Sequence, residues 1–218
     1  MARSPDLSAD RARALALIPV SRETSGRLDR FVDLLLTWQQ RINLVAPSTI
    51  PKLWTRHIAD SLQLLAHAPG AKVWADFGSG AGFPGLVLAC ALAETPGARV
   101  HLVESNTKKA SFLREAARVT GAAADVHPVR AVDFVDNLSD SVEIVTARAL
   151  APLAALLAEA YPLLKTGSIG LFPKGQDVDA ELTDAAKCWS MQASLIPSLT
   201  DPKGRIVKVT TAHPKAAL

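Results

Sequence analysis

The sequence contains few of the residues that build disulfide frameworks or metal centres. Only two of its 218 residues are cysteines, Cys90 and Cys188, and they lie too far apart for a redox or metal-ligand motif. Its five histidines show no metal-ligand spacing either. We therefore expect no metal site, and we expect both cysteines to be small buried side chains within helices, in a reducing compartment.

Long apolar runs are also missing. No segment approaches the ~20 apolar residues of a membrane span. The run from Ala12 to Val20 is short, contains Arg13 and follows Asp6 and Asp10, which indicates an amphipathic helix rather than a signal peptide. The pattern predicts a soluble, cytoplasmic protein with no membrane partner.

The composition predicts one sizeable hydrophobic core but does not name a partner. Hydrophobic residues make up 49% of the chain and charged residues 21%. The formal net charge of +3 and the pI near 9.0 suit a polyanionic partner, yet many proteins without such a partner are equally basic. Charge alone therefore does not decide the function.

Hydrophobic periodicity divides the chain near residue 70. Before that point apolar residues recur at helical spacing after Ser21, a plausible N-cap: Leu28, Phe31, Leu34, Leu35 and Trp38. After it, short apolar runs alternate with helix-like stretches: Val73–Phe77, Arg99–Val103, Ala124–Val129, Val142–Thr146 and Ser168–Phe172. This alternation predicts an α/β fold with a mostly parallel sheet, helices on both faces and ligands at the carboxyl ends of the strands.

The two ends of the chain complete this division. From Ser190 onward two further strand-like runs follow without a clear helix between them, which predicts an antiparallel hairpin at the edge of the sheet. We expect a helical N-terminal region over residues 1–70 and a catalytic domain over residues 71–218, packed as one globular unit.

The strongest local signal is a glycine-rich loop after the first predicted strand, running from Asp76 to Gly85. Its glycines allow tight turns and close approach to a ligand where a β-carbon would clash, and Pro84 suits the first turn of the following helix. The alternative is an ordinary tight turn, but four glycines within eight residues at a strand-to-helix junction favour a nucleotide-cofactor loop. Its candidate contacts are Asp76, Gly78, Gly80, Gly82 and Phe83.

Two acidic residues bear on the choice of cofactor. The segment Gly80–Gly85 also satisfies the dinucleotide pattern G-x-G-x-x-G. Asp76 would lie unfavourably near a pyrophosphate, yet it could complement the sulfonium and ammonium of S-adenosylmethionine. Glu104 follows the second strand, where a carboxylate can accept both ribose hydroxyls of either cofactor, or could instead cap the helix beginning near Asn106. The residues favour the cationic cofactor.

A nicotinamide oxidoreductase would also need proton-transfer groups. Tyr161 and Lys165 form a Tyr-x-x-x-Lys pair, but Pro162 interrupts it and Tyr161 lies among leucines on a helix that faces the core. Core packing is the better interpretation of Tyr161.

Taken together, these features resemble the glucose-inhibited division protein B family, the small-subunit ribosomal RNA guanine-N7 methyltransferases. The resemblance covers most of the chain and depends on the order and spacing of several short motifs. They are Trp38 with Ile42-Asn43-Leu44, Arg56 to Leu62, the glycine loop ending Phe83-Pro84-Gly85, Glu104-Ser105 with Lys108-Lys109 and Phe112-Leu113-Arg114, Arg130 with Asp133-Phe134, Arg148-Ala149, and Lys174-Gly175.

The resemblance implies a Rossmann-like class I methyltransferase, with a seven-stranded mostly parallel sheet and an N-terminal helical extension. It implies that S-adenosylmethionine contacts Gly78, Phe83, the backbone around Ala131 and Val132, and Arg148, with Glu104 on the ribose. The implied substrate is one guanine of 16S ribosomal RNA, free or in the small ribosomal subunit. We expect a monomer that does not bind DNA.

Guanine N7 carries a lone pair and no proton, so methyl transfer to it needs alignment more than a general base. Basic residues at strand ends would lie on the rim of the cofactor site and position phosphates, Arg148 and Lys174 before Arg205. Further basic residues on the helix after Glu104 could extend a positive surface or could be ordinary solvated charges: Lys108, Lys109, Arg114 and Arg118.

A polar group in the N-terminal region could close one wall of the substrate site. It consists of Asn43, Arg56, His57 and Asp60. Arg56 and Asp60 could equally be a helix-surface ion pair at i, i+4. Under the functional hypothesis, alanine at His57 lowers methyl transfer with little change in melting temperature or cofactor affinity. Competing hypotheses are a methyltransferase for another substrate, a nicotinamide oxidoreductase and a non-catalytic RNA-binding protein.

Overall fold

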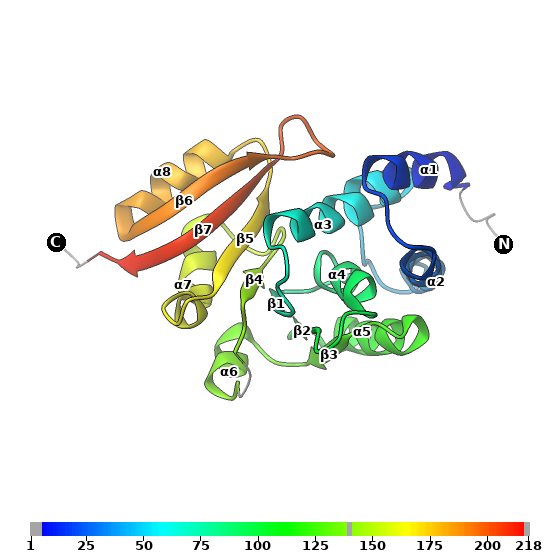
Figure 1. Cartoon of the computed structure of the whole chain (residues 1–218), viewed down its shortest axis with the longest axis horizontal. Coiled ribbons are helices and arrows are strands. Elements are labelled where there is room, and N and C mark those ends of the chain that lie inside the picture. The colour runs from blue at the N-terminus through cyan, green and yellow to red at the C-terminus, as the bar shows by residue number, and fades with distance from the viewer. Residues whose placement is uncertain (1–5, 139–140, 216–218) are drawn as a thin grey trace.

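A computed structural model describes residues 6–138 and 141–215 of the chain. A seven-stranded sheet runs through the molecule in the order β3-β2-β1-β4-β5-β7-β6 (Figure 1). The first five strands are parallel: β1 (Val73–Phe77), β2 (Arg99–Val103), β3 (Ala124–His127), β4 (Ile144–Thr146) and β5 (Ile169–Lys174). The last two are antiparallel to their neighbours: β6 (Trp189–Pro197) and β7 (Arg205–Pro214).

This sheet confirms the predicted fold class and the predicted edge hairpin. The strands β1 and β2 have the predicted bounds. The strand β3 ends at His127, two residues earlier than predicted, because Pro128 has no N–H to donate to a neighbouring strand. The strand β7 pairs with β5, which leaves β6 as the outer strand.

The N-terminal region is helical, as predicted. It contains α1 (Ser8–Leu17) and α2 (Arg22–Gln39), then short turns of helix: η1 (Pro47–Lys52), η2 (Trp54–Ala59), α3 (Asp60–Leu62) and η3 (Gln63–His67). Ser21 caps α2, since its Oγ accepts the Thr24 N–H at 3.1 Å. The predicted apolar stripe of α2 faces inward, with Leu28, Phe31 and Leu35 fully buried.

Helices cover both faces of the sheet (Figure 1). On one face lie α4 (Gly85–Leu92) and α5 (Thr107–Thr120), against which α2 packs. On the other lie α6 (Ala131–Asp136), α7 (Leu153–Leu164) and α8 (Val178–Cys188). Side chains of a strand point alternately to the two faces, so β1 is buried on both: Trp74 belongs to the first core, and Ala75 and Phe77 to the second.

Aromatic contacts join the N-terminal helices to the first core. The Phe31 ring lies 5.3 Å from the Phe83 ring and 6.3 Å from the Phe112 ring, measured between centroids. Burying a side chain of this size contributes about 1.5–3 kcal/mol. The helix α2 is therefore packed directly against the glycine loop and α5.

Two smaller expectations have different outcomes. Cys90 is buried in α4, as expected, but Cys188, the last residue of α8, is exposed, so the expectation that both cysteines are buried is wrong for Cys188. Tyr161 is half-buried against the Trp189 ring at 5.5 Å, which confirms core packing as its role. Among the described residues, no helix is long and apolar enough to cross a membrane.

Close packing between α4 and β1 leads to a first prediction. A β-carbon at Gly85 would lie 2.4 Å from Leu102 Cδ2 and 2.5 Å from Asp76 Oδ2. We expect Gly85→Ala to lower the free energy of unfolding by about 1–3 kcal/mol in urea denaturation. Gly26→Ala is the control, because Gly26 lies inside α2 with nothing nearer than 3.7 Å and should gain about 0.5–1 kcal/mol. A Gly85→Ala protein as stable as the parent would contradict the packing.

Candidate functional site

The glycine loop lies at the carboxyl ends of β1 and β2. Gly78, Gly80 and Gly82 have φ values of 64°, 54° and 89°, a region that L-residues with side chains seldom adopt. The loop is fixed to the sheet because the Ser79 N–H donates to Val103 O at 3.1 Å and Ser79 Oγ donates to Asp76 O at 2.8 Å. A β-carbon at Gly80 would meet only Gly78 O, at 3.6 Å, so this side of the loop is open to a ligand.

Asp76 is completely buried beneath this loop. Its Oδ2 accepts the N–H of Gly85 at 3.1 Å, at the start of α4, where a helix favours negative charge. Its Oδ1 has no hydrogen-bond partner among the described residues. Burial raises the pKa of Asp76 from 3.8 to about 7. Pro84 immediately precedes α4, rather than lying in its first turn.

Glu104 connects the glycine loop to the start of α5. Its Oε2 accepts the Gly80 N–H at 2.9 Å, and its Oε1 accepts the Asn106 N–H at 2.7 Å. The cap of α5 is Asn106 itself, whose Oδ1 accepts the N–H groups of Lys108 and Lys109. Glu104 accepts a backbone N–H at the start of α5, but its bond to Gly80 shows that it does more than cap that helix, and each of its oxygens retains a lone pair for a further donor.

Arg148 forms the centre of a polar and aromatic cluster next to the loop. Its Nη2 donates to His57 Nδ1 at 2.7 Å, and its Nη1 lies 3.4 Å from Asp60 Oδ2. Its guanidinium carbon lies 5.2 Å from the centre of the Phe83 ring, on which His57 also stacks at 4.9 Å. Residues from the segment after β4, the glycine loop and the N-terminal region therefore meet at one point.

His57 is held in one orientation and in its neutral form. Its Nδ1 accepts from Arg148, so its Nε2 carries the proton and donates to Thr49 Oγ1 at 3.0 Å. Burial and the positive charges of Arg148 and Arg56 lower the pKa of His57 to about 3. An imidazole in this state keeps its acceptor nitrogen for the guanidinium.

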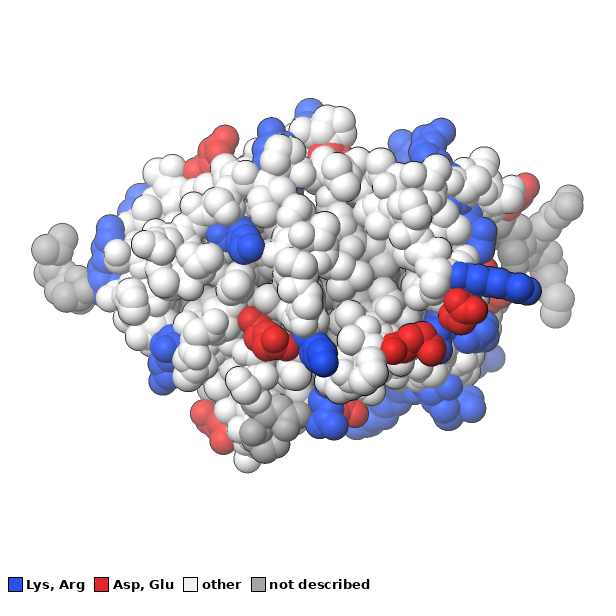
Figure 2. All heavy atoms as spheres, in the orientation of Figure 1, with Lys and Arg blue, Asp and Glu red and all other residues white. Residues whose placement is uncertain are grey.

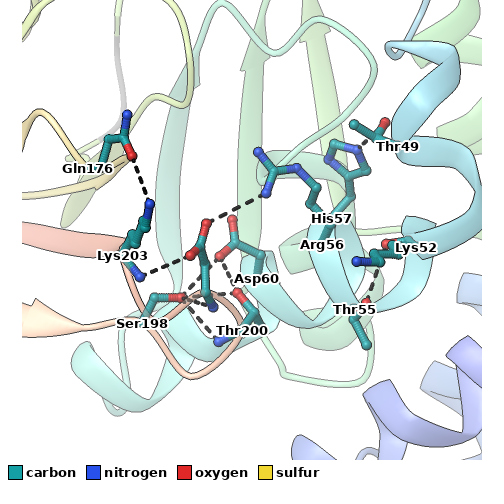
Figure 3. Close-up of polar contacts among 12 residues, drawn as sticks. Thr49, Lys52, Thr55, Arg56, His57, Asp60, Gln176, Ser198, Thr200 and Lys203 are labelled. Atoms are coloured by element: carbon teal, nitrogen blue, oxygen red, sulfur yellow. Dashed lines mark hydrogen bonds and ion pairs between the residues drawn. The ribbon is translucent and has the colours of Figure 1, made fainter.

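Asp60 links this cluster to the loop between β6 and β7. Its Oδ1 accepts from Thr200 Oγ1 at 2.7 Å and lies 3.5 Å from Ser198 Oγ, as Figure 3 shows. Arg56 pairs with Asp201 at 3.6 Å rather than with Asp60, so the helix-surface pair suggested by their spacing does not form. The N-terminal region and the β6–β7 loop thus share a charged contact.

These elements surround a cleft of about 820 Å³. Its walls come from the N-terminal turns, the residues after β4 and β5, and the β6–β7 loop; they include His57, Arg148, Leu150, Lys174 and Arg205. Lys203 reaches across from that loop to Gln176 Oε1 at 3.4 Å (Figure 3). Leu150 lines the cleft and also lies against Gly78, where a β-carbon would be 2.6 Å from its Cδ1. The cleft and the glycine loop are therefore adjacent.

The remaining predicted residues lie in different surroundings. Lys174 is almost fully buried and pairs with Glu181 at 2.7 Å. Asn43 is exposed and does not line the cleft. Ala131 and Val132 begin α6, and Val132 is 60% exposed.

The basic residues of α5 are largely exposed, at the edge of the molecule where Figure 2 shows lysine and arginine gathered. They lie on a different part of the surface from the residues that line the cleft: Lys108, Lys109, Arg114 and Arg118. The described residues contain no group of three or more histidine, cysteine or acidic side chains placed to hold a metal.

Sequence reasoning missed Thr49, Thr200, Glu181 and Leu150. Thr200, Glu181 and Leu150 act through contacts with residues distant in the chain, and Thr49 contacts His57 from a segment without hydrophobic periodicity. No local motif marks them.

The neutral state of His57 leads to a pH prediction. The unfolded chain takes up a proton near pH 6.5, whereas the folded chain does so only near pH 3. The stability that His57 contributes is therefore complete above pH 6.5 and falls as the pH is lowered from 6.5 towards 3, by at most ~1.4 kcal/mol per pH unit. Nitrogen NMR should show a neutral ring down to pH 5, and His57→Phe should lack this part of the pH dependence. A His57 midpoint near 6.5 would sink the assignment.

A second prediction concerns the buried carboxyl of Asp76. Its raised pKa means that the folded state holds a proton between pH 3.8 and 7 that the unfolded state releases, so its contribution to stability falls as the pH rises through this window. We expect Asp76→Asn to raise the free energy of unfolding at pH 8 by at least about 1 kcal/mol, with a smaller gain at pH 4. The same variant should bind S-adenosylmethionine about tenfold more weakly by calorimetry. Unchanged stability at both pH values would contradict the raised pKa.

Comparison with known proteins agrees with this geometry. Residues 25–207 match the model of the GidB family, described as rRNA small subunit methyltransferase G. The chain is 61% identical to a protein of that name from Nitrobacter hamburgensis, over 95% of this chain and 80% of the relative. It is 62% identical to one from Bradyrhizobium sp. strain BTAi1, over 93% and 91%.

A solved structure supports the fold. The O-methyltransferase from Bacillus cereus in complex with SAH aligns with a TM-score of 0.60 at 16% identity, over 94% of this chain and 98% of that one. The similarity to the family model extends from the N-terminal helix α2, through the glycine loop and the cleft, into β7. The chain belongs to the GidB family, rRNA small subunit methyltransferase G.

Proposed function

We propose that this protein transfers a methyl group from S-adenosylmethionine to N7 of one guanine in 16S ribosomal RNA. The observation that carries the proposal is the contact between the glycine loop and the cleft, formed by Phe83, His57 and Arg148. In a family of small-subunit rRNA methyltransferases, this junction is where a cofactor and a base can meet.

The residues of the loop fit S-adenosylmethionine. Gly80 leaves the backbone open on one side, Glu104 keeps lone pairs for a ribose, and the unpartnered Oδ1 of Asp76 provides a buried carboxyl oxygen. We propose that these residues hold the cofactor together with Gly82, Phe83 and the backbone of Ala131 and Val132. When bound, the cofactor supplies an electrophilic methyl group on a sulfonium.

The protein's own residues have to align the guanine with the methyl group. Guanine N7 carries no proton to be removed, so no general base is required, and orienting two reactants can lower a barrier by ~7–11 kcal/mol in model systems. His57, as a neutral acceptor, keeps Arg148 in place, and Arg148 presents N–H donors at the cleft wall that suit the acceptor groups of guanine or a phosphate. Asn43, which is exposed and does not line the cleft, stays a predicted substrate contact. Alanine at His57 would remove the stacking on Phe83, so we now expect stability to fall along with activity, in contrast to the small change in melting temperature expected from the sequence.

We further propose that the protein acts in the cytoplasm as a monomer, on rRNA or the small subunit and not on DNA. The division into a helical region of residues 1–70 and a methyltransferase domain of residues 71–218 is part of the same proposal. Its support is that α2 packs into the core that also contains α4 and α5, so both parts share one core.

The deciding test is mass spectrometry of 16S rRNA from a strain lacking the gene. We expect one 7-methylguanosine to be missing and to return when the intact gene is supplied, and labelled methyl transfer to isolated small subunits should agree. An unchanged modification profile would refute the substrate. If the protein binds NAD but not S-adenosylmethionine, an oxidoreductase is favoured. If it binds S-adenosylmethionine but methylates another molecule, a different methyltransferase is favoured.

A further inference from the structure

The sequence places Lys174 at a strand end that faces the site, but its side chain is paired with other groups of the protein. Its side chain is only 7% exposed. Its Nζ donates to Ala151 O at 2.7 Å and pairs with Glu181 Oε2 at 2.7 Å. Both partners are protein groups, so the ammonium of this cleft-lining residue is already engaged.

Glu181 completes the arrangement from α8. The same Oε2 accepts the N–H of Leu153 at 2.7 Å, the first residue of α7, where a carboxylate suits the exposed N–H groups of a helix start. One ion pair therefore holds the carbonyl of Ala151 and the amide of Leu153. The chain between them is fixed at both ends.

The segment held in this way, residues 148–153, is called the strap below. Ala149 has φ 55° and is the only non-glycine residue with positive φ among the described residues, a conformation that costs about 1–2 kcal/mol. It places Leu150 against Gly78 on one side, while Arg148 contacts His57 on the other. A strap released from Ala151 and Leu153 would relax from this strained conformation.

We propose that Lys174 and Glu181 are positioning residues, whose ion pair holds the strap so that Arg148 and Leu150 keep their places between the glycine loop and the cleft. Lys174 then acts through the strap and not by binding RNA phosphate. The inference rests on the proposed function for its reaction readout, but the position of the strap can be measured without any substrate.

The experiment compares Lys174→Met and Glu181→Gln with a matched pair on the same helix. Lys187 and Asp184 form an exposed ion pair on α8, each 69% exposed, so Lys187→Met and Asp184→Asn serve as controls. In cofactor-free protein, we expect hydrogen exchange in the strap and at the Leu153 amide to be about tenfold faster in either test variant, with β1 unchanged. The controls should match the parent.

Binding and activity then separate positioning from RNA contact. We expect the Kd for S-adenosylhomocysteine to rise about tenfold in both test variants and kcat for small subunits to fall, with KM within about twofold. The double variant should be no worse than the more severe of the two single variants, because both substitutions remove the same ion pair. Glu181→Gln keeps an acceptor for Leu153 and serves as the milder variant if Lys174→Met folds poorly.

Three results would overturn the proposal. Exchange in the strap equal to that of the parent would show that the ion pair does not hold it, and faster exchange throughout the protein would show a general structural role. A tenfold rise in KM that occurs in Lys174→Met but not in Glu181→Gln, and that becomes smaller as salt is added, would indicate direct phosphate contact. If the parent protein methylates no small subunits, the proposed function fails, while exchange and S-adenosylhomocysteine binding still decide the role of Lys174.

Discussion

The site depends on one half-buried guanidinium. Arg148 follows β4, yet its partners belong to the N-terminal region, and its guanidinium also lies over the ring of Phe83 in the glycine loop. Burial lowers the pKa of Arg148, and the negative charge of Asp60 acts in the opposite direction. Removing an arginine from water is costly unless its donors are satisfied. The contacts of Arg148 with His57, Asp60 and Phe83 therefore fix the N-terminal turns, the glycine loop and the segment after β4 relative to each other.

Other ionisable groups are also buried at the carboxyl ends of the strands. Asp76 is fully buried with one oxygen unpartnered among the described residues, each oxygen of Glu104 accepts one backbone N–H, and Lys174 is paired inside the protein. These three groups lie at the carboxyl ends of β1, β2 and β5, and burying an ionisable group is costly unless it is paired or hydrogen-bonded. Here the glycine loop and two helix starts supply the N–H donors, so the costs are partly offset. Groups kept in this way remain in place for a ligand.

Several features could be predicted because their causes are local. The five parallel strands follow from short apolar runs, the cap of α2 from Ser21, and the cofactor loop from closely spaced glycines after a strand. The roles of Arg56 and Lys174 could not be predicted in this way. Spacing paired Arg56 with Asp60, whereas the fold pairs it with Asp201 from the β6–β7 loop. An ion pair forms with whichever opposite charge packing brings near, and sequence spacing constrains only neighbours on one helix.

The sequence by itself determined the α/β class, the edge hairpin and the position of the glycine loop, because each depends on side-chain periodicity or on backbone freedom within a few residues. The tertiary structure alone decided which charges meet. Arg148 and Asp60 are 88 residues apart in the chain, and Asp60 and Thr200 are 140 apart. Such contacts depend on how helices and loops pack around the sheet, and so do the cleft they enclose and the proposed strap at its base.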